Sequence, residues 1–277
     1  MSDNIDRKTV EGFGDEWSRF DQSALAAAES EILFERYFRI FPWDALPPDA
    51  AGFDMGCGSG RWARIAAKRV GRLLCVDASE AALHVARRNL AGSANCTLAL
   101  GSVDALPMAN DSMDFGYAIG VLHHVPDTAA GLRCCVEKLK PGAPFLLYLY
   151  YSLDNRPWWF RAIWRASNLF RLIVSRLPFR LRLPVTQIIA SLVYYPLARL
   201  SLIMERLGLP VSGIPLSSYR HSSFFTMRTD TLDRFGTRLE QRFSRQQVLE
   251  MMERSGLERI VVSEAVPYWT AVGFRGS

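Results

Sequence analysis

The 277-residue chain is poor in cysteine and histidine, and both scarcities exclude classes of protein. Its five cysteines form no Cys-x-x-Cys pair, so neither a disulfide framework nor a zinc-finger pattern fits. The four histidines form no His-Glu-x-x-His motif, and we expect no metal site. Residues 1–30 start acidic and polar and lack the profile of a signal segment, so we expect a cytoplasmic location.

Lysine is also scarce, with four in the chain, and the positive charge is confined to one arginine-rich stretch. Nine arginines and a single acid lie between Arg156 and Arg206, whereas the remaining residues are slightly acidic within a net charge of +5. A nucleic-acid-binding protein more often spreads lysines over its binding face. We therefore expect a small-molecule substrate rather than a nucleic acid.

Short apolar runs alternate with helix-like stretches from residue 51 to residue 151, the spacing of repeated β-α units. Helices are predicted over 61–70 and 79–90. The runs are continuously apolar, which is typical of parallel strands covered on both faces and predicts an α/β sandwich. The predicted strands are 51–55, 73–76, 97–100, 115–119 and 144–150.

The alternation of apolar runs and helix-like stretches, and the places where it stops, divide the chain into four segments. Residues 1–50 are predicted to be a helical extension, and 51–151 a cofactor-binding core. Residues 152–243 break the rhythm and are predicted to be a largely helical, arginine-rich insertion. Residues 244–277 supply a helix, opened by a capping box at Ser244 and Gln247, and then two antiparallel strands.

The inserted segment contains a run over 186–204 with a single charged residue, Arg199. Its length would allow a membrane span, but Pro196 and several polar residues disfavour one. A helical lid over a substrate site and a helix that lies in a membrane surface remain as interpretations. The second would make 156–206 a peripheral membrane contact, because arginine and tryptophan are typical of such helices.

The most informative motif is Asp54-Met-Gly-Cys-Gly-Ser-Gly60, between a predicted strand and a helix. Glycines at alternate positions let the backbone turn sharply and approach a ligand closely. A dinucleotide site would need a glycine where Arg61 stands and would have to accept a pyrophosphate, which Asp54 repels. An acid at this position favours a cofactor that carries a cationic amino group.

Two more acids follow the next two predicted strands. Asp77 ends the second strand, where a carboxylate can accept both hydroxyls of a ribose. Asp104 lies just past the third strand, where it could accept a hydrogen bond from the exocyclic amine of an adenine. Each acid alone could be a solvated loop residue, but three at successive strand ends favour one shared site.

These motifs resemble those of class I S-adenosylmethionine-dependent methyltransferases, in the subgroup that acts on small molecules and quinones. The resemblance rests on the glycine loop, the two later acids, the segment 114–126 and Leu139-Lys-Pro-Gly142. It implies a Rossmann-like, seven-stranded, mostly parallel sheet with helices on both faces. The arginine-rich insertion then falls between the fifth and sixth strands.

The resemblance also implies a cofactor, S-adenosylmethionine, and roles for particular residues. The glycines of the loop would underlie its methionine part, Asp77 would bind the ribose and Asp104 would face the adenine. The implied cofactor-binding residues are Asp54, Gly56, Gly58, Gly60, Asp77, Asp104 and Gly120, the last beside the methyl sulfonium.

A general base is required only if the acceptor must lose a proton. His123 and His124 follow the fourth predicted strand, at the mouth where a substrate would sit, and an imidazole suits that role. The alternative is that the pair only shapes its loop. Arg220, His221 and Arg228 would suit a substrate with a carboxylate, phosphate or phenolate.

Three segments without clear periodicity, 12–17, 219–226 and 229–237, are interpreted as pocket walls or surface loops. The first could fold over the cofactor. The sequence thus predicts methyl transfer to an oxygen, nitrogen or carbon of a small, acidic or amphiphilic molecule. One alternative is a methyltransferase at the inner face of the membrane that acts on a lipid or isoprenoid quinone precursor. Another is a regulatory protein that binds the cofactor without catalysis.

Overall fold

The computed structural model describes residues 4–277 and divides into two compact units. The first unit is formed by Met1–Gln22, Ser30–Asp154 and Leu239–Ser277. The second is formed by Ser23–Glu29 and Asn155–Arg238. Each unit is described by itself below.

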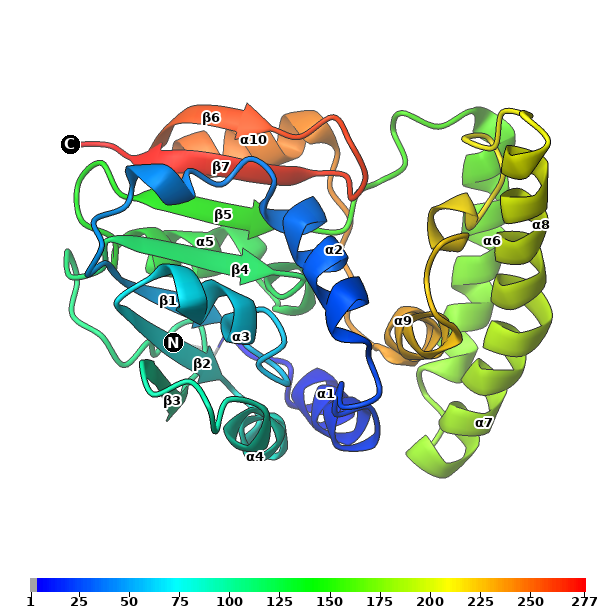
Figure 1. The fold of residues 1–277 in the computed structure, drawn as a ribbon, viewed down its shortest axis with the longest axis horizontal. Coiled ribbons are helices and arrows are strands. Elements are labelled where there is room, and N and C mark those ends of the chain that lie inside the picture. The colour runs from blue at the N-terminus through cyan, green and yellow to red at the C-terminus, as the bar shows by residue number, and fades with distance from the viewer. Residues whose placement is uncertain (1–3) are drawn as a thin grey trace. The chain divides into compact units, whose positions relative to one another are not determined.

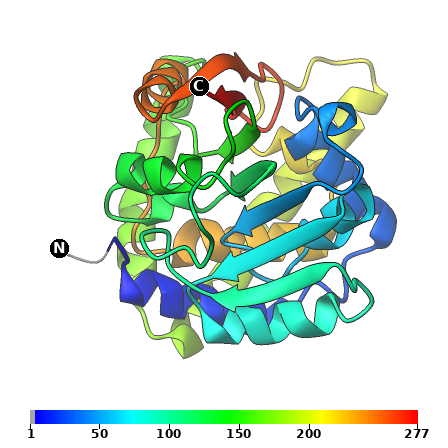
Figure 2. The ribbon, with the colours of Figure 1, turned by 90° about the vertical axis from the view of Figure 1, so that its left-hand side faces the viewer.

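A sheet of seven strands runs through the described part of the first unit (Figures 1 and 2), in the order β3-β2-β1-β4-β5-β7-β6. Strands β1 to β5 are parallel to their neighbours, and β7 is antiparallel to both β5 and β6. This arrangement confirms the predicted Rossmann-like sheet. The strands are β1 (Ala51–Met55), β2 (Arg72–Asp77), β3 (Cys96–Leu100), β4 (Phe115–Ile119), β5 (Pro144–Tyr148), β6 (Leu257–Val262) and β7 (Thr270–Arg275).

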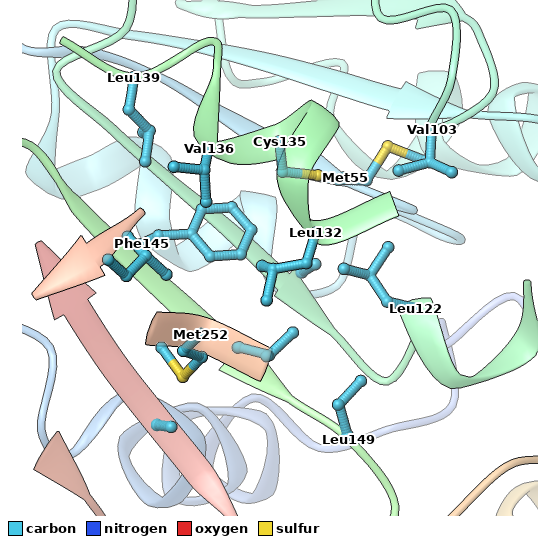
Figure 3. Close-up of a cluster of buried hydrophobic side chains, with 14 of the residues drawn as sticks. Met55, Val103, Leu122, Leu132, Cys135, Val136, Leu139, Phe145, Leu149 and Met252 are labelled. Carbon is cyan, nitrogen blue, oxygen red and sulfur yellow. The ribbon is translucent and has the colours of Figure 1, made fainter. Parts of the chain in front are cut away.

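Helices cover both faces of this sheet. On one face, α5 (Thr128–Val136) and α10 (Arg245–Arg254) contribute to a core around Phe145, shown in Figure 3. On the other face, α2 (Ala27–Phe38), α3 (Ala63–Ala66) and α4 (Glu80–Asn89) pack on Phe115 and Tyr117. Side chains of a strand alternate between the two faces, so continuously apolar strands feed both cores.

The helices of the first unit begin with side-chain caps where the sequence offers them. Ser79 accepts a hydrogen bond from the Ala82 N–H group and begins α4. The Ser244–Gln247 capping box begins α10 as predicted, because each of the two residues satisfies a backbone donor of the other. Such caps fix where each helix starts relative to the strand before it.

The second unit consists mainly of helices inserted between β5 and β6, as predicted. Its helices are α6 (Trp158–Val174), α7 (Phe179–Ile189), a π turn η4 (Ala190–Tyr194), α8 (Tyr195–Arg206) and α9 (Phe224–Gly236). Together α7, η4 and α8 form one long helix beside α6 (Figure 1), and α9 packs against α6, α7 and η4. The π turn immediately precedes Pro196, which has no N–H group to continue a regular ladder.

Two predictions about loops are wrong, because helical periodicity was hidden by hydroxyl and glycine residues. Residues 229–237 lie mostly in α9, where the hydroxyls of Thr229 and Thr231 bond to carbonyl oxygens four residues earlier. Residues 12–17 lie in α1 (Arg7–Arg19), whose Gly14 allows close packing on Ser79. A Cβ atom on Gly14 would lie 2.7 Å from the Ser79 Oγ.

The helix predicted over 61–70 is shorter than expected. Only Ala63–Ala66 is α-helical, and Ala67–Arg69 follows as a 3-10 turn, η2. The apolar positions of the prediction are nevertheless buried in the core beneath α2 and α4. Further short 3-10 turns are η1 (Trp43–Ala45), η3 (Leu122–His124) and η5 (Ser217–Tyr219).

Candidate cofactor site

The strands β1, β2 and β3 are neighbours, and the three predicted acids lie in β1, at the end of β2 and after β3. Asp54 pairs in register with Cys75 and with Tyr117, so it lies between the neighbouring strands β2 and β4. Asp77 is the last residue of β2 and aligns with Leu100, the last of β3. A crevice outside the carboxyl ends of parallel strands is the usual ligand site of such sheets.

The glycine loop folds back over the end of β2. The N–H groups of Gly56 and Cys57 both donate to the Val76 carbonyl oxygen, at 2.7 and 3.0 Å. All three glycines of the loop have positive φ, and Gly58 has a φ of +54°. Side chains are strained in this left-handed region, so the loop needs glycine there.

Asp77 fastens this loop to the start of α4. Its Oδ2 accepts the Gly58 N–H group at 2.8 Å, and its Oδ1 accepts the Ser79 N–H group at 2.9 Å. Burial raises the pKa of Asp77, whereas the backbone donors of Ser79, Gly58 and Ala78 oppose that shift. A carboxylate oxygen has two acceptor sites, so each oxygen can accept one more hydrogen bond.

Asp54 is almost completely buried and not at the open end of its strand. Burial raises its pKa well above the usual range, and the Asp77 carboxylate contributes in the same direction, while the Tyr117 hydroxyl opposes it. Within residues 4–277, Asp54 Oδ2 has no hydrogen-bond partner. A buried acceptor without a donor is costly, and a cationic N–H donor would relieve that cost.

Asp104 follows β3 as predicted, but its carboxylate is exposed and contacts other parts of the chain. Its Oδ2 accepts the Asn4 N–H group at 2.9 Å, and its Oδ1 accepts the Ser102 hydroxyl. The Ser102 hydroxyl and the Asn4 N–H group lower the pKa of Asp104. The loop is nevertheless joined to Asp77, because the Gly101 N–H group donates to the Asp77 carbonyl oxygen at 3.0 Å.

The histidine pair is buried inside the first unit, and its position at the mouth of a substrate site stays a prediction. His123 is 0% exposed, and its ring centroid lies 3.9 Å from those of His124 and Tyr150. Burial lowers the pKa of His123 well below its usual value, and His124 and Arg242 act in the same direction. His123 is therefore neutral, and neither of its ring nitrogens has a hydrogen-bond partner among the described residues.

The second histidine is oriented by the backbone. The Nδ1 atom of His124 lies 2.7 Å from the Leu239 carbonyl oxygen, so this nitrogen carries the proton. Its ring also contacts Phe13 of α1 at 4.9 Å between centroids. Gly120, which follows β4 and has a φ of +78°, donates its N–H to the Tyr148 carbonyl oxygen at 3.1 Å.

The predicted substrate-binding residues lie in the second unit, where two of them meet on one acid. Glu205 accepts Arg220 at Oε1 and contacts His221 Nε2 at Oε2, each at 2.8 Å. The Arg220 guanidinium and then His221 lower the pKa of Glu205. Arg228 donates instead to the Gln187 side chain.

Trp17 ends the segment 12–17, which could fold over the cofactor by the sequence analysis, and it packs on the glycine loop. A Cβ atom on Gly58 would lie 2.9 Å from the indole of Trp17, and the Arg61 guanidinium lies 5.7 Å from the centre of that indole. Trp17 and Gly14 are three residues apart, so both occupy one face of α1. That spacing was the signal available in the sequence. Within residues 4–277, no three His, Cys, Asp or Glu side chains cluster as metal ligands.

Comparisons with known proteins agree with this geometry. Residues 53–147 match the family model described as a methyltransferase domain. This segment, about a third of the chain, is thus similar to methyltransferase domains. The matched residues include the glycine loop, the acids after β2 and β3, and both histidines.

Among curated relatives, a ubiquinone biosynthesis O-methyltransferase of Hahella chejuensis is 32% identical over 157 residues, which are 56% of this chain and 64% of the relative. A similar enzyme of Methylocella silvestris is 31% identical over 117 residues, which are 40% of this chain and 46% of the relative. The chain spans less than two thirds of the length of the curated relatives it matches first.

A solved structure of a methyltransferase from Thermotoga maritima has the same fold. It covers 96% of this chain and 100% of its own, with a TM-score of 0.51 and 13% sequence identity. At this identity the likeness supports the fold alone, which is the predicted one.

Proposed function

We propose that the chain is a methyltransferase that uses S-adenosylmethionine to methylate an oxygen, nitrogen or carbon of a small molecule. The observation that carries the proposal is the pairing of two carboxylates at the glycine loop. Asp77 holds the Gly58 N–H group, and Asp54 presents a buried oxygen that lacks a donor. Both features suit a ligand with hydroxyls and a cationic amino group.

Each residue then has a specific task in binding. The remaining acceptor sites of Asp77 receive two ribose hydroxyls, and Asp54 Oδ2 receives the ammonium of the methionine part. The glycines allow the ligand to approach the backbone. The bound cofactor supplies an electrophilic methyl group on a sulfonium. The protein contributes mainly alignment of the two reactants, for which about 7–11 kcal/mol is available when the geometry is good.

His123 is the proposed acceptor of a substrate proton. Its ring is neutral and buried, and both nitrogens lack a partner among residues 4–277, so it can accept a hydrogen bond from a hydroxyl or amine. His124 is proposed to support it through ring contact, because its own Nδ1 proton is used by Leu239. The proposed role of Gly120 is to leave the position directly after β4 without a side chain.

The two predicted anion-binding residues on Glu205 have a competitor inside the chain. An acidic substrate could use Arg220 and His221 only by displacing Glu205, and Arg228 donates to the Gln187 side chain. We propose single substitutions of all three as the test for recognition of an acidic group. Asp104 can meet an adenine amine through the acceptor sites that Asn4 and Ser102 leave on its exposed carboxylate.

A narrower candidate is O-methylation of an isoprenoid quinone precursor. It is favoured by relatives that are named ubiquinone biosynthesis O-methyltransferases and are up to 32% identical over their matched segments. Such a substrate would offer an acidic phenol to His123 and an apolar tail. The cytoplasmic location stays a prediction.

The test has two stages. Calorimetry with S-adenosylhomocysteine should show binding to the wild-type chain, and an absence of binding would contradict the whole proposal. A labelled-methyl assay on a metabolite extract should then give a product, and its partition between water and hexane separates a polar acceptor from an isoprenoid one. Cofactor binding without transfer to any extract fraction would favour the regulatory alternative.

A further inference from the structure

The second unit exposes large apolar side chains along two of its helices. Trp158 is 75% exposed and Leu192 is 71% exposed, and many neighbours on the same helices are similar. A soluble monomer rarely shows a continuous apolar patch of this kind without a partner. We call the following residues the apolar face: Trp158, Trp159, Ile163, Leu169, Phe170, Ile173, Leu181, Ile188, Leu192, Leu200, Ile203 and Leu207.

On α6 these residues follow the helical repeat. Trp158, Leu169 and Ile173 are separated by eleven and four residues, and intervals of this size return to the same side of a helix. The opposite side of α6 faces the interior of the second unit, where Arg171 and Val174 are buried. The apolar side chains therefore point outward from the unit rather than into its core.

The long helix formed by α7, η4 and α8 repeats the pattern. Leu181, Ile188 and Leu192 are separated by seven and four residues, and a second exposed set follows the π turn. The segment Phe179–Arg206 is long and apolar enough to cross a membrane. Only 22% of its most apolar stretch of 18 residues is buried in the structure, so most of that stretch is at least partly exposed. Length alone does not decide between crossing a bilayer and lying on it.

The inner side of the same long helix packs on the apolar core of the unit and also carries hydrogen-bonded arginines. Arg182 donates to the Gly236 carbonyl oxygen at 3.1 Å, and Arg199 donates to the carbonyl oxygens of Arg220 and Ser222 at 3.0 and 3.2 Å. Crossing a bilayer would break these bonds or place both guanidinium groups among acyl chains, at high cost. A helix with one side bound to protein and an exposed apolar side fits the plane of a membrane surface.

The charge beside the apolar face selects the kind of membrane. Between Arg156 and Met204 the chain contains arginines and no acid. The buried and half-buried arginines leave a further set of exposed ones: Arg161, Arg165, Arg176, Arg180 and Arg206. Arginine heads at the edge of an apolar surface attract anionic lipid head groups, and exposed tryptophan is favoured at that depth.

We propose that the apolar face docks flat on an anionic phospholipid bilayer, with its apolar side chains among the upper acyl chains and the exposed arginines at the phosphates. Docking involves the second unit alone and does not depend on methyl transfer. It also gives the α6–α9 insertion a role that a small-molecule methyltransferase domain by itself does not require.

The experiment is co-sedimentation of the full chain with vesicles of phosphatidylglycerol and phosphatidylcholine. The wild-type chain should bind vesicles that contain phosphatidylglycerol, bind pure phosphatidylcholine at least tenfold more weakly, and lose affinity as salt rises. A triple variant, Trp158→Ser with Leu169→Ser and Ile173→Ser, should lose at least tenfold in vesicle affinity. The control is Val261→Ser on β6, which removes an exposed apolar side chain outside the apolar face and should bind like wild type.

Fluorescence reports the depth of docking. Brominated lipids should quench the tryptophan emission of the wild-type chain, and the double variant Trp158→Phe with Trp159→Phe should lose most of that quenching while still binding. Because these substitutions keep aromatic side chains, a folding defect is not expected to mask the result.

Four results would overturn the proposal. One is no binding at low salt, and another is equal binding to both vesicle types. A third is retention of the chain in the membrane after alkaline carbonate treatment, which would indicate a span. The last is the finding, by sedimentation equilibrium without lipid, of a dimer that the triple variant does not form. The apolar face would then be an interface between two copies of the chain.

Discussion

Replacement of Asp77 by alanine separates the loop-holding and ligand-binding parts of the site. The carboxylate accepts N–H groups from the glycine loop and from the start of α4. Hydrogen bonds to a charged group contribute about 1.5–3 kcal/mol each. Asp77→Ala should therefore lower the free energy of unfolding by an amount of this order, because two backbone donors lose their acceptor.

The loss in cofactor affinity follows from the proposed ribose contacts. The same range of about 1.5–3 kcal/mol corresponds to roughly a 10- to 150-fold increase in the dissociation constant of S-adenosylhomocysteine. Calorimetry at 25 °C on folded protein measures it. Asp77→Asn should bind S-adenosylhomocysteine nearly as weakly as Asp77→Ala. Its amide keeps a single acceptor oxygen, and its NH₂ group faces one of the two backbone N–H donors.

Asp114 provides a matched control at the opposite end of β1. Its carboxylate also accepts a backbone N–H group, that of Ala51 at 2.8 Å, and a Lys140 ammonium at 2.6 Å. Asp114→Ala should lose stability yet bind S-adenosylhomocysteine within twofold of wild type. If folded Asp77→Ala binds as well as wild type, the proposed ribose site is refuted.

Three further predictions concern the same unit. Because folding raises the pKa of Asp54, wild-type stability falls as the pH rises above about 3.9. In urea denaturation between pH 5 and 8, Asp54→Asn should therefore be more stable than wild type. The same variant should bind S-adenosylhomocysteine more weakly. Because folding lowers the pKa of His123, its contribution to stability is lost as the pH falls below about 6.5. The variant His123→Gln should therefore be less acid-sensitive than wild type in denaturation. It should keep its affinity for S-adenosylhomocysteine and lose about 10²–10⁴-fold in the rate of methyl transfer to a hydroxyl acceptor. Gly58→Ala should cost about 1–2 kcal/mol from its positive φ alone and more from contact with Trp17, whereas Gly92→Ala, with open space around it, should be nearly neutral in thermal denaturation.

The strands and the glycine loop were predictable because local sequence determines them. A strand covered on both faces must be continuously apolar, and β4 meets that condition at every residue. The capping box of α10 needs only two side chains three residues apart. The three loop glycines require positive φ wherever the neighbouring helices lie. None of these features depends on distant parts of the chain.

The chemical state of the acids depended on partners distant in sequence. Position at a strand end suggested an accessible Asp54, but its burial results from pairing with β2 and β4. Asp104 was placed after the correct strand, yet one of its oxygens is used by Asn4, one hundred residues earlier. Likewise, the burial of His123 depends on stacking against Tyr150, which a motif does not record.

The second unit buries two arginines beside its apolar core, whereas many large apolar side chains of its helices are exposed. Arg171 and Arg182 are buried and donate to the Thr237 and Gly236 carbonyl oxygens, at the carboxyl end of α9, where the helix dipole favours positive charge. Leucine and tryptophan occupy the outside instead. A periodicity argument assigns every apolar residue to the core, so it does not predict the exposed apolar sides of α6 and of the long helix. An environment that stabilises apolar side chains on the outside, with arginine at the margin, would favour this arrangement, and a lipid surface is such an environment.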